Sequence, residues 1–166
     1  MKKIGFLGLG VMGLPMALNV LKKSGYPVLG FDVAQARLDQ FAAAGGETTS
    51  DPVDIYKTCD VIMQMLPTHP IIINSIKQAV QYGKPGNIIL DLDSTAPDII
   101  QELYPEVKAA GMHLLDSPDS GGNPMAIAGT LAIMTGGDKE VRHHQAPAGV
   151  HGPSRLYRRV CQRQHY

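Results

Sequence analysis

The sequence has no tryptophan, and aromatic residues make up only 5% of its 166 positions. A nucleic-acid surface that stacks bases on aromatic side chains is therefore poorly supported. The two cysteines, Cys59 and Cys161, do not suggest a disulfide framework. No segment approaches the roughly 18 consecutive apolar residues of a membrane-spanning helix. We expect a cytoplasmic protein with no nucleic-acid and no membrane partner.

Acidic residues are absent from the end of the chain. Residues 142–166 contain five arginines and no aspartate or glutamate, whereas residues 1–141 contain ten basic and all fifteen acidic residues. The formal net charge of zero is thus the sum of −5 and +5. Residues 142–166 also show no strand or helix period. We expect residues 1–141 to form one domain, and residues 142–166 to be a basic, unpatterned tail that is disordered or derived from a frameshift.

Short apolar runs alternate with helical patterns along residues 1–141. The sequence predicts strands at residues 4–9, 28–32, 60–66, 87–92, 112–116 and 130–135. It predicts helices at residues 14–23, 34–44, 71–82 and 97–110. Near-continuous apolar strands that alternate with helices are typical of a parallel sheet covered on both faces. The predicted fold is α/β, with a doubly wound, mainly parallel sheet.

A glycine pattern follows the first predicted strand. Residues 8–13, Gly-Leu-Gly-Val-Met-Gly, match G-x-G-x-x-G at the start of a helix, and Asp32 ends the next strand. In a dinucleotide-binding turn the first glycine permits the tight turn, the second lets the pyrophosphate approach, and the third lets the helix pack on the strand. Asp32 can accept hydrogen bonds from a ribose and would repel a 2′-phosphate. The pattern favours NAD(H) as the cofactor, with NADP(H) possible.

Further motifs accompany this turn in a fixed order. Leu14-Pro15-Met16-Ala17 follows it, Leu66-Pro67 stands at the end of the strand predicted at residues 60–66, and residues 116–122 read Asp-Ser-Pro-Asp-Ser-Gly-Gly. Together they resemble the β-hydroxyacid dehydrogenases, which include 3-hydroxyisobutyrate dehydrogenase and tartronate semialdehyde reductase. The resemblance implies a Rossmann-type domain without the family's helical C-terminal domain. It also implies an oxidoreductase that oxidises a small 3-hydroxy acid or reduces the matching semialdehyde.

The same resemblance implies the residues of the site. A hydroxy-carboxylate substrate would contact Ser94, Ser120, Gly121 and Gly122. The nicotinamide dinucleotide would contact Gly8, Leu9, Gly10, Val11, Met12, Gly13, Asp32, Leu66, Pro67, Ser94 and Thr95. No metal is expected. The family's catalytic lysine has no counterpart in this sequence, so we expect no catalytic residue, a truncated form with little or no activity, and a homo-oligomer only for a full-length form.

Three residues depart from the family's pattern. Asp93 stands where a serine is usual, Asp119 replaces an apolar residue beside the Ser-Gly-Gly sequence, and Met125 replaces a common glycine. A carboxylate at position 119 would oppose the binding of an acidic substrate unless it points away or pairs with a cation. The substrate class implied by the resemblance therefore depends on where the Asp119 side chain lies.

Two other interpretations stay open. The chain could be a stand-alone dinucleotide-binding module with a regulatory or interaction role. It could also belong with the phosphosugar-acid dehydrogenases, which share the Ser-Gly-Gly region but differ from Leu14-Pro15-Met16-Ala17 after the glycine turn. An assay of hydride transfer to or from a hydroxy acid distinguishes a dehydrogenase, which carries out this reaction, from a stand-alone binding module, which does not.

Overall fold

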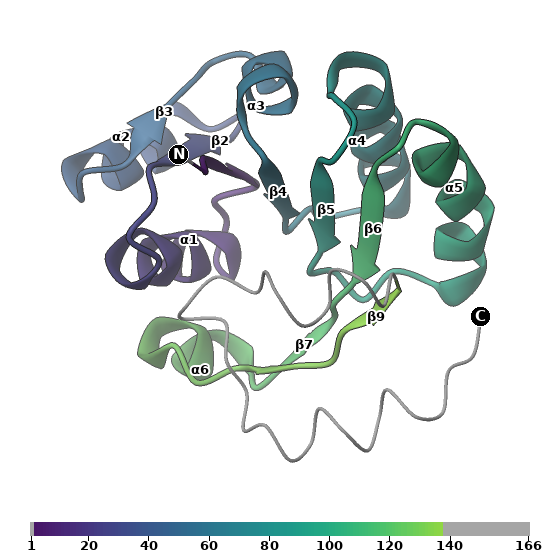
Figure 1. The fold of residues 1–166 in the computed structure, drawn as a ribbon. Helices are drawn as coiled ribbons and strands as arrows, with labels where there is room; N and C mark the ends of the chain where they lie inside the picture. The colour runs from purple at the N-terminus through teal and green to yellow at the C-terminus, as the bar shows by residue number, and fades with distance from the viewer. Residues whose placement is uncertain (1, 138–166) are drawn as a thin grey trace.

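The computed structural model describes residues 2–137 of the chain. A seven-stranded sheet in the order β3-β2-β1-β4-β5-β6-β9 has helices on both faces (Figure 1). No helix in residues 2–137 is long and apolar enough to cross a membrane. The expectations for residues 142–166 and for Cys161 lie outside the described residues.

The strand order identifies the type of sheet. Its strands are β1 (Ile4–Leu7), β2 (Val28–Phe31), β3 (Glu47–Thr48), β4 (Val61–Gln64), β5 (Ile88–Asp91), β6 (His113–Asp116) and β9 (Gly136–Gly137). Neighbouring strands are parallel except β6 and β9. The chain adds strands outward from β1 and then from β4 on the other side, as in doubly wound dinucleotide-binding sheets. The predicted α/β class and mainly parallel sheet are confirmed.

Two apolar cores cover the two faces of this sheet. The helices are α1 (Gly13–Lys23), α2 (Gln35–Ala43), α3 (Pro52–Thr58), α4 (His69–Tyr82), α5 (Pro97–Ala109) and α6 (Gly122–Ala128). Met63 and Leu90 pack with α1, α2 and α6, whereas Ile62 and Ile89 pack with α3, α4 and α5. Successive side chains of a strand point to opposite faces, so a strand that is buried on both sides is apolar throughout.

The structure contains short elements that the sequence patterns did not predict. Helix α3 begins where the Asp51 carboxylate accepts the Val53 N–H at 2.9 Å, with Pro52 at the first helical position. These are ordinary helix-start signals, but the seven-residue helix is too short to show a clear apolar period. Helix α6 was missed because its first turn is rich in glycine and proline.

The strand predicted at residues 130–135 is wrong in its extent and in its place. Only β8 (Ala132–Ile133) forms there, and it pairs antiparallel with β7 (Asp119–Ser120) in a separate two-stranded sheet. The main sheet is instead extended by β9. A Cβ on Gly137 would lie 2.5 Å from the Leu114 carbonyl oxygen, so glycine permits this close approach.

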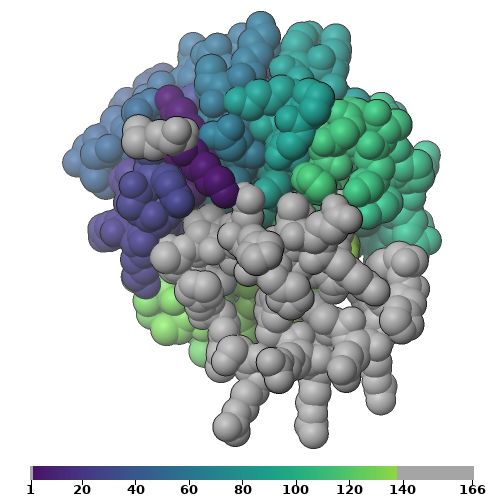
Figure 2. Space-filling model, in the orientation of Figure 1, coloured from purple at the N-terminus to yellow at the C-terminus, as the bar shows by residue number. Residues whose placement is uncertain are grey.

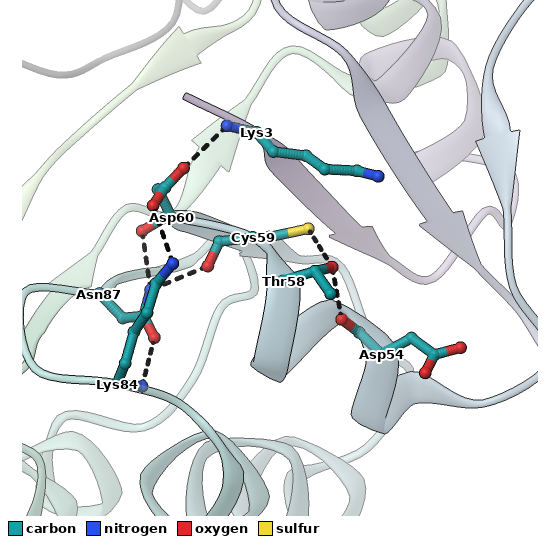
Figure 3. Close-up of polar contacts among 7 residues, drawn as sticks. All are labelled: Lys3, Asp54, Thr58, Cys59, Asp60, Lys84 and Asn87. Carbon is teal, nitrogen blue, oxygen red and sulfur yellow. Dashed lines mark hydrogen bonds and ion pairs between the residues drawn. The ribbon is translucent and has the colours of Figure 1, made fainter. Parts of the chain in front are cut away.

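A buried amide holds the amino ends of β4 and β5 together (Figure 3). Asn87 is 1% exposed, and its Nδ2 donates to the carbonyl oxygens of Cys59 at 2.9 Å and of Asp60 at 3.3 Å. Its Oδ1 accepts the backbone N–H of Lys84 at 2.8 Å. The Asn87 amide and the Cys59 carbonyl are buried, so neither can exchange this bond for one to water, and Asn87 joins the two strands at this edge.

We expect Asn87→Ala to lower the free energy of unfolding by roughly 1–3 kcal/mol, because it leaves the buried carbonyl oxygen of Cys59 without the donor at Asn87. Urea denaturation of the chain measures this quantity. Lys84→Ala is the matched control, since it removes only an exposed ion pair with Asp60 at 3.2 Å. That variant should lose less than about 1 kcal/mol. Equal losses of unfolding free energy in the two variants would contradict the role assigned to the Asn87 amide.

Candidate functional site

The glycine turn is closed on its protein side and open on the other. Gly8 has φ +92°, and a Cβ on it would collide with the Met65 carbonyl oxygen. A Cβ on Gly13 would collide with the carbonyl oxygen of Gly8. By contrast, a Cβ on Gly10 would have no heavy atom within 4 Å. Gly8 and Gly13 thus serve the packing of the turn, and Gly10 leaves space above it.

This space lies over unsatisfied backbone donors. In the described part of the chain, the N–H groups of Gly10, Val11 and Met12 have no hydrogen-bond partner, and no side chain caps the start of α1. The first N–H groups of a helix carry partial positive charge and attract phosphates. The absence of a side chain at Gly10 and the free donors beside it fit a pyrophosphate group.

Asp32 is held by two backbone donors directly after β2. Its Oδ2 accepts the Leu9 N–H at 2.7 Å, and its Oδ1 accepts the Ala34 N–H at 2.8 Å. The first contact links the carboxylate to the glycine turn, and the second fixes it at the start of the segment leading to α2. Each oxygen retains lone-pair capacity, so the carboxylate is placed to accept hydrogen bonds from a ribose.

Two other predicted segments leave the sheet at the same edge. Leu66-Pro67 follows β4, and Ser94-Thr95 follows β5. The Leu66 N–H donates to both oxygens of Asp93, at 2.9 and 3.0 Å, which joins the two segments. Ser94 is exposed, whereas Thr95 is buried and its hydroxyl has no partner. Because carboxyl ends of parallel strands share one edge, the structure brings these residues to the side of the glycine turn.

The Ser-Gly-Gly segment also reaches the glycine turn. Ser120, Gly121 and Gly122 are exposed at the start of α6. Nearby, Asn123 Nδ2 donates to the Val11 carbonyl oxygen at 2.7 Å. Helix α6 lies against α1 (Figure 2). The residues proposed for substrate and for cofactor therefore lie on one continuous part of the molecule.

Two asparagines fasten this arrangement. Besides the contact from Asn123, Asn19 Nδ2 donates to the carbonyl oxygens of Ala126 at 2.8 Å and of Pro15 at 3.0 Å. Asn19 belongs to the motif after the glycine turn, but its partner in α6 is 107 positions away. The sequence carries no local signal for Asn123. Neither contact was predicted.

The same edge is rich in buried and half-buried carboxylates. Burial raises the pKa of Asp93 to about 8, with the negative charge of Asp91 acting in the same direction. Burial likewise raises the pKa of Asp116 to about 6 and raises that of Asp119. Asp119 is half-buried: its Oδ2 is buried without a partner, and neither of the two ion pairs found within residues 2–137 includes it. No three His, Cys, Asp or Glu in that range are placed to hold a metal ion.

Comparison with known proteins first gives a family. A family model described as the NAD binding domain of 6-phosphogluconate dehydrogenase matches residues 3–148. The match covers the glycine turn, the Leu66-Pro67 and Ser94-Thr95 segments and the Ser-Gly-Gly segment. It therefore includes every residue that the sequence analysis assigned to the site.

Individual relatives narrow the type of enzyme. The chain is 35% identical to the NAD-dependent L-serine dehydrogenase of Pseudomonas aeruginosa, covering 89% of this chain and 50% of that protein. It is also 35% identical to human mitochondrial 3-hydroxyisobutyrate dehydrogenase, covering 93% of this chain and 47% of that protein. A solved Mycobacterium tuberculosis 3-hydroxyisobutyrate dehydrogenase with L-serine is 33% identical, with a TM-score of 0.79 over 86% of this chain and 50% of that chain. The chain thus spans about half the length of these relatives.

Substitutions at two glycines of the turn should affect the stability of the chain to different extents. We expect Gly13→Ala to lower the free energy of unfolding by about 3 kcal/mol, because the new methyl group collides with backbone at Gly8. Gly10→Ala should change it by less than about 1 kcal/mol, since its methyl group enters open space. Urea denaturation of both variants checks this. A large loss in Gly10→Ala would show that the open side has been assigned wrongly.

Proposed function

Because the chain belongs to the family described as the NAD binding domain of 6-phosphogluconate dehydrogenase, we propose that residues 1–141 are the cofactor-binding half of an NAD-dependent hydroxyacid dehydrogenase. Its substrate would be a small 3-hydroxy acid or the matching semialdehyde. One observation carries most of the proposal: the turn at residues 8–13 is tightly packed below and open above its free N–H groups.

The cofactor would lie along the carboxyl edge of the sheet. Its pyrophosphate would bind the N–H groups at Gly10, Val11 and Met12, and its adenosine ribose would bind Asp32. A carboxylate at this place repels a 2′-phosphate, which supports NAD over NADP. The bound nicotinamide supplies the hydride chemistry, while the chain's own residues bind and orient it.

The substrate would bind beside the exposed Ser120-Gly121-Gly122 segment. The two named relatives act on L-serine and 3-hydroxyisobutyrate, which are small carboxylates with a hydroxyl group on the β-carbon. Asn123 holds this segment against Val11 of the glycine turn at 2.7 Å. That contact supports a site in which the substrate carboxylate and the cofactor are held by adjoining segments.

We expect the chain to bind NADH about tenfold more tightly than NADPH, because Asp32 repels the additional phosphate. Titration of each nucleotide, followed by its fluorescence, gives the two dissociation constants. Asp32→Asn should narrow the difference, since the amide keeps an acceptor but removes the charge.

Gly10→Ala tests the position of the nucleotide independently of the charge on Asp32. It should weaken the binding of both nucleotides, because its methyl group occupies the space over the free N–H groups. Tighter binding of NADPH than NADH would overturn the assignment of Asp32. Unchanged binding in Gly10→Ala would place the nucleotide elsewhere.

Joining residues 1–137 to the C-terminal half of human 3-hydroxyisobutyrate dehydrogenase tests the reaction. We expect the fusion to oxidise 3-hydroxyisobutyrate with NAD, measured as formation of NADH, at least ~10²-fold faster than the chain alone. Positioned acid–base groups contribute ~10²–10⁴-fold to such rates. A fusion that folds and binds NADH but transfers no hydride would favour a stand-alone binding module.

A further inference from the structure

A row of acceptor side chains crosses the carboxyl edge of the sheet. Gln64, Asp91 and Asp116 are the last residues of β4, β5 and β6 and are register partners, so their side chains share one face. Gln64 and Asp91 are both 0% exposed. Gln64 Nε2 donates to Asp91 Oδ1 at 3.1 Å, which leaves Gln64 Oε1 and Asp91 Oδ2 without partners.

This edge contains all the buried side-chain polar atoms that lack a partner within residues 2–137. Besides the two in the row, they are Thr95 Oγ1, Asp116 Oδ1 and Asp119 Oδ2. All five are oxygen atoms. Buried acceptors without donors are rare in folded proteins because they lose their hydrogen bonds to water. A ligand that brings hydrogen-bond donors or positive charge would complement them.

The described part of the chain supplies no cation to this edge. The two ion pairs within residues 2–137 use Glu47 and Asp60 instead. The charged groups that act on Asp93 are two further carboxylates, Asp91 at the end of β5 and Asp119 in β7. The segment after β4 offers Asp93 only a neutral backbone N–H, at Leu66. A group of donors or a positive charge must therefore come from outside these residues.

One expected ligand brings a positive charge to this place. A dinucleotide on a doubly wound sheet lies across the point where the strand order reverses, here between β1 and β4. Asp32 follows β2 on the adenosine side, so the nicotinamide half falls toward β4 and β5. The oxidised nicotinamide ring is a cation, and the reduced ring is neutral. Resting on the proposed NAD(H) site, we propose that Asp93, backed by Asp91 and Asp119, makes the site prefer the oxidised cofactor.

Asp93 is the carboxylate best fixed for this role. It is 7% exposed, and both of its oxygens accept the Leu66 N–H, at 2.9 and 3.0 Å. When Asp93 is ionised, its negative charge is therefore held between the Leu66-Pro67 and Ser94-Thr95 segments proposed to bind the nicotinamide half. A charge in a buried, cation-free place is weakly screened and acts strongly on a nearby cation.

The preference should depend on pH. Burial raises the pKa of Asp93 to about 8, and the negative charges of Asp91 and Asp119 act in the same direction. The neutral acid therefore predominates at about pH 6.5 and the carboxylate at about pH 9. Only the carboxylate attracts a cation, so the preference for oxidised cofactor should increase as the pH rises through this range.

Binding of NAD⁺ and NADH to the whole chain tests the proposal, by calorimetry at about pH 6.5 and about pH 9. We expect the ratio of the NADH to the NAD⁺ dissociation constant to increase about tenfold between the two conditions. A tenfold change corresponds to about 30 mV in the potential of the bound two-electron couple. Asp93→Asn should remove the increase, because its amide oxygen can still accept the Leu66 N–H but carries no charge. Asp119→Asn should reduce it.

Asp98→Asn is the matched control, because Asp98 is exposed in the first turn of α5. It should leave the increase unchanged. A ratio that is independent of pH in the unaltered chain, or unchanged in both Asp93→Asn and Asp119→Asn, would overturn the proposal. If Asp93→Asn does not fold, the pH dependence of the ratio in the unaltered chain and in Asp119→Asn tests the proposal. Failure to bind either nucleotide would instead refute the proposed NAD(H) site.

Discussion

The site depends on a contact between backbone segments that only glycine permits. Gly13 lies against the carbonyl oxygen of Gly8, and Gly8 lies against that of Met65, with no room for a Cβ at either glycine. This contact places the start of α1 at the carboxyl ends of β1 and β4. The unsatisfied N–H groups of Gly10 and Val11 are thereby held at the edge where the sheet order reverses. Every other part of the site is positioned relative to this turn.

The Ser-Gly-Gly segment and helix α6 are attached to the same turn by side-chain amides. Asn19 in α1 donates to the Ala126 carbonyl oxygen, and Asn123 in α6 donates to that of Val11. Helix α6 has only seven residues, and a helix this short is not stable by itself. The hydrogen bonds from Asn19 and Asn123 therefore hold it in place. A displacement of the glycine turn would therefore also displace the Ser-Gly-Gly segment.

The carboxylates at this edge oppose stability rather than support it. Asp91 is fully buried and Asp93 nearly so, whereas the ion pairs found within residues 2–137 join Lys3 to Glu47 and Lys84 to Asp60. Groups whose pKa values are raised by burial and by like charge are common at functional sites, because a ligand can relieve their cost. The amino edge is different, since there the buried side chain of Asn87 has a partner for both its amide nitrogen and its amide oxygen.

Local residue patterns were enough to predict five of the seven strands of the main sheet, β1, β2, β4, β5 and β6, and the glycine turn, whereas the two-residue strands β3 and β9 were not predicted. Buried parallel strands are apolar along their whole length, and a turn that presses backbone against backbone needs glycines at fixed spacing. The short elements α3 and α6 were missed because seven residues show little period. The place of β8 depended on a partner, β7, that the sequence patterns did not predict.

The sequence by itself thus determined the fold class, the glycine turn and the order of the motifs. Tertiary structure alone decided which side chains meet. Asp93 and Leu66 are 27 positions apart, and Asn123 and Val11 are 112 apart. Such contacts depend on strand order and register, which bring the ends of distant strands to one edge. The acidic character of that edge follows from the same register, because Gln64, Asp91 and Asp116 lie in one row only when β4, β5 and β6 pair.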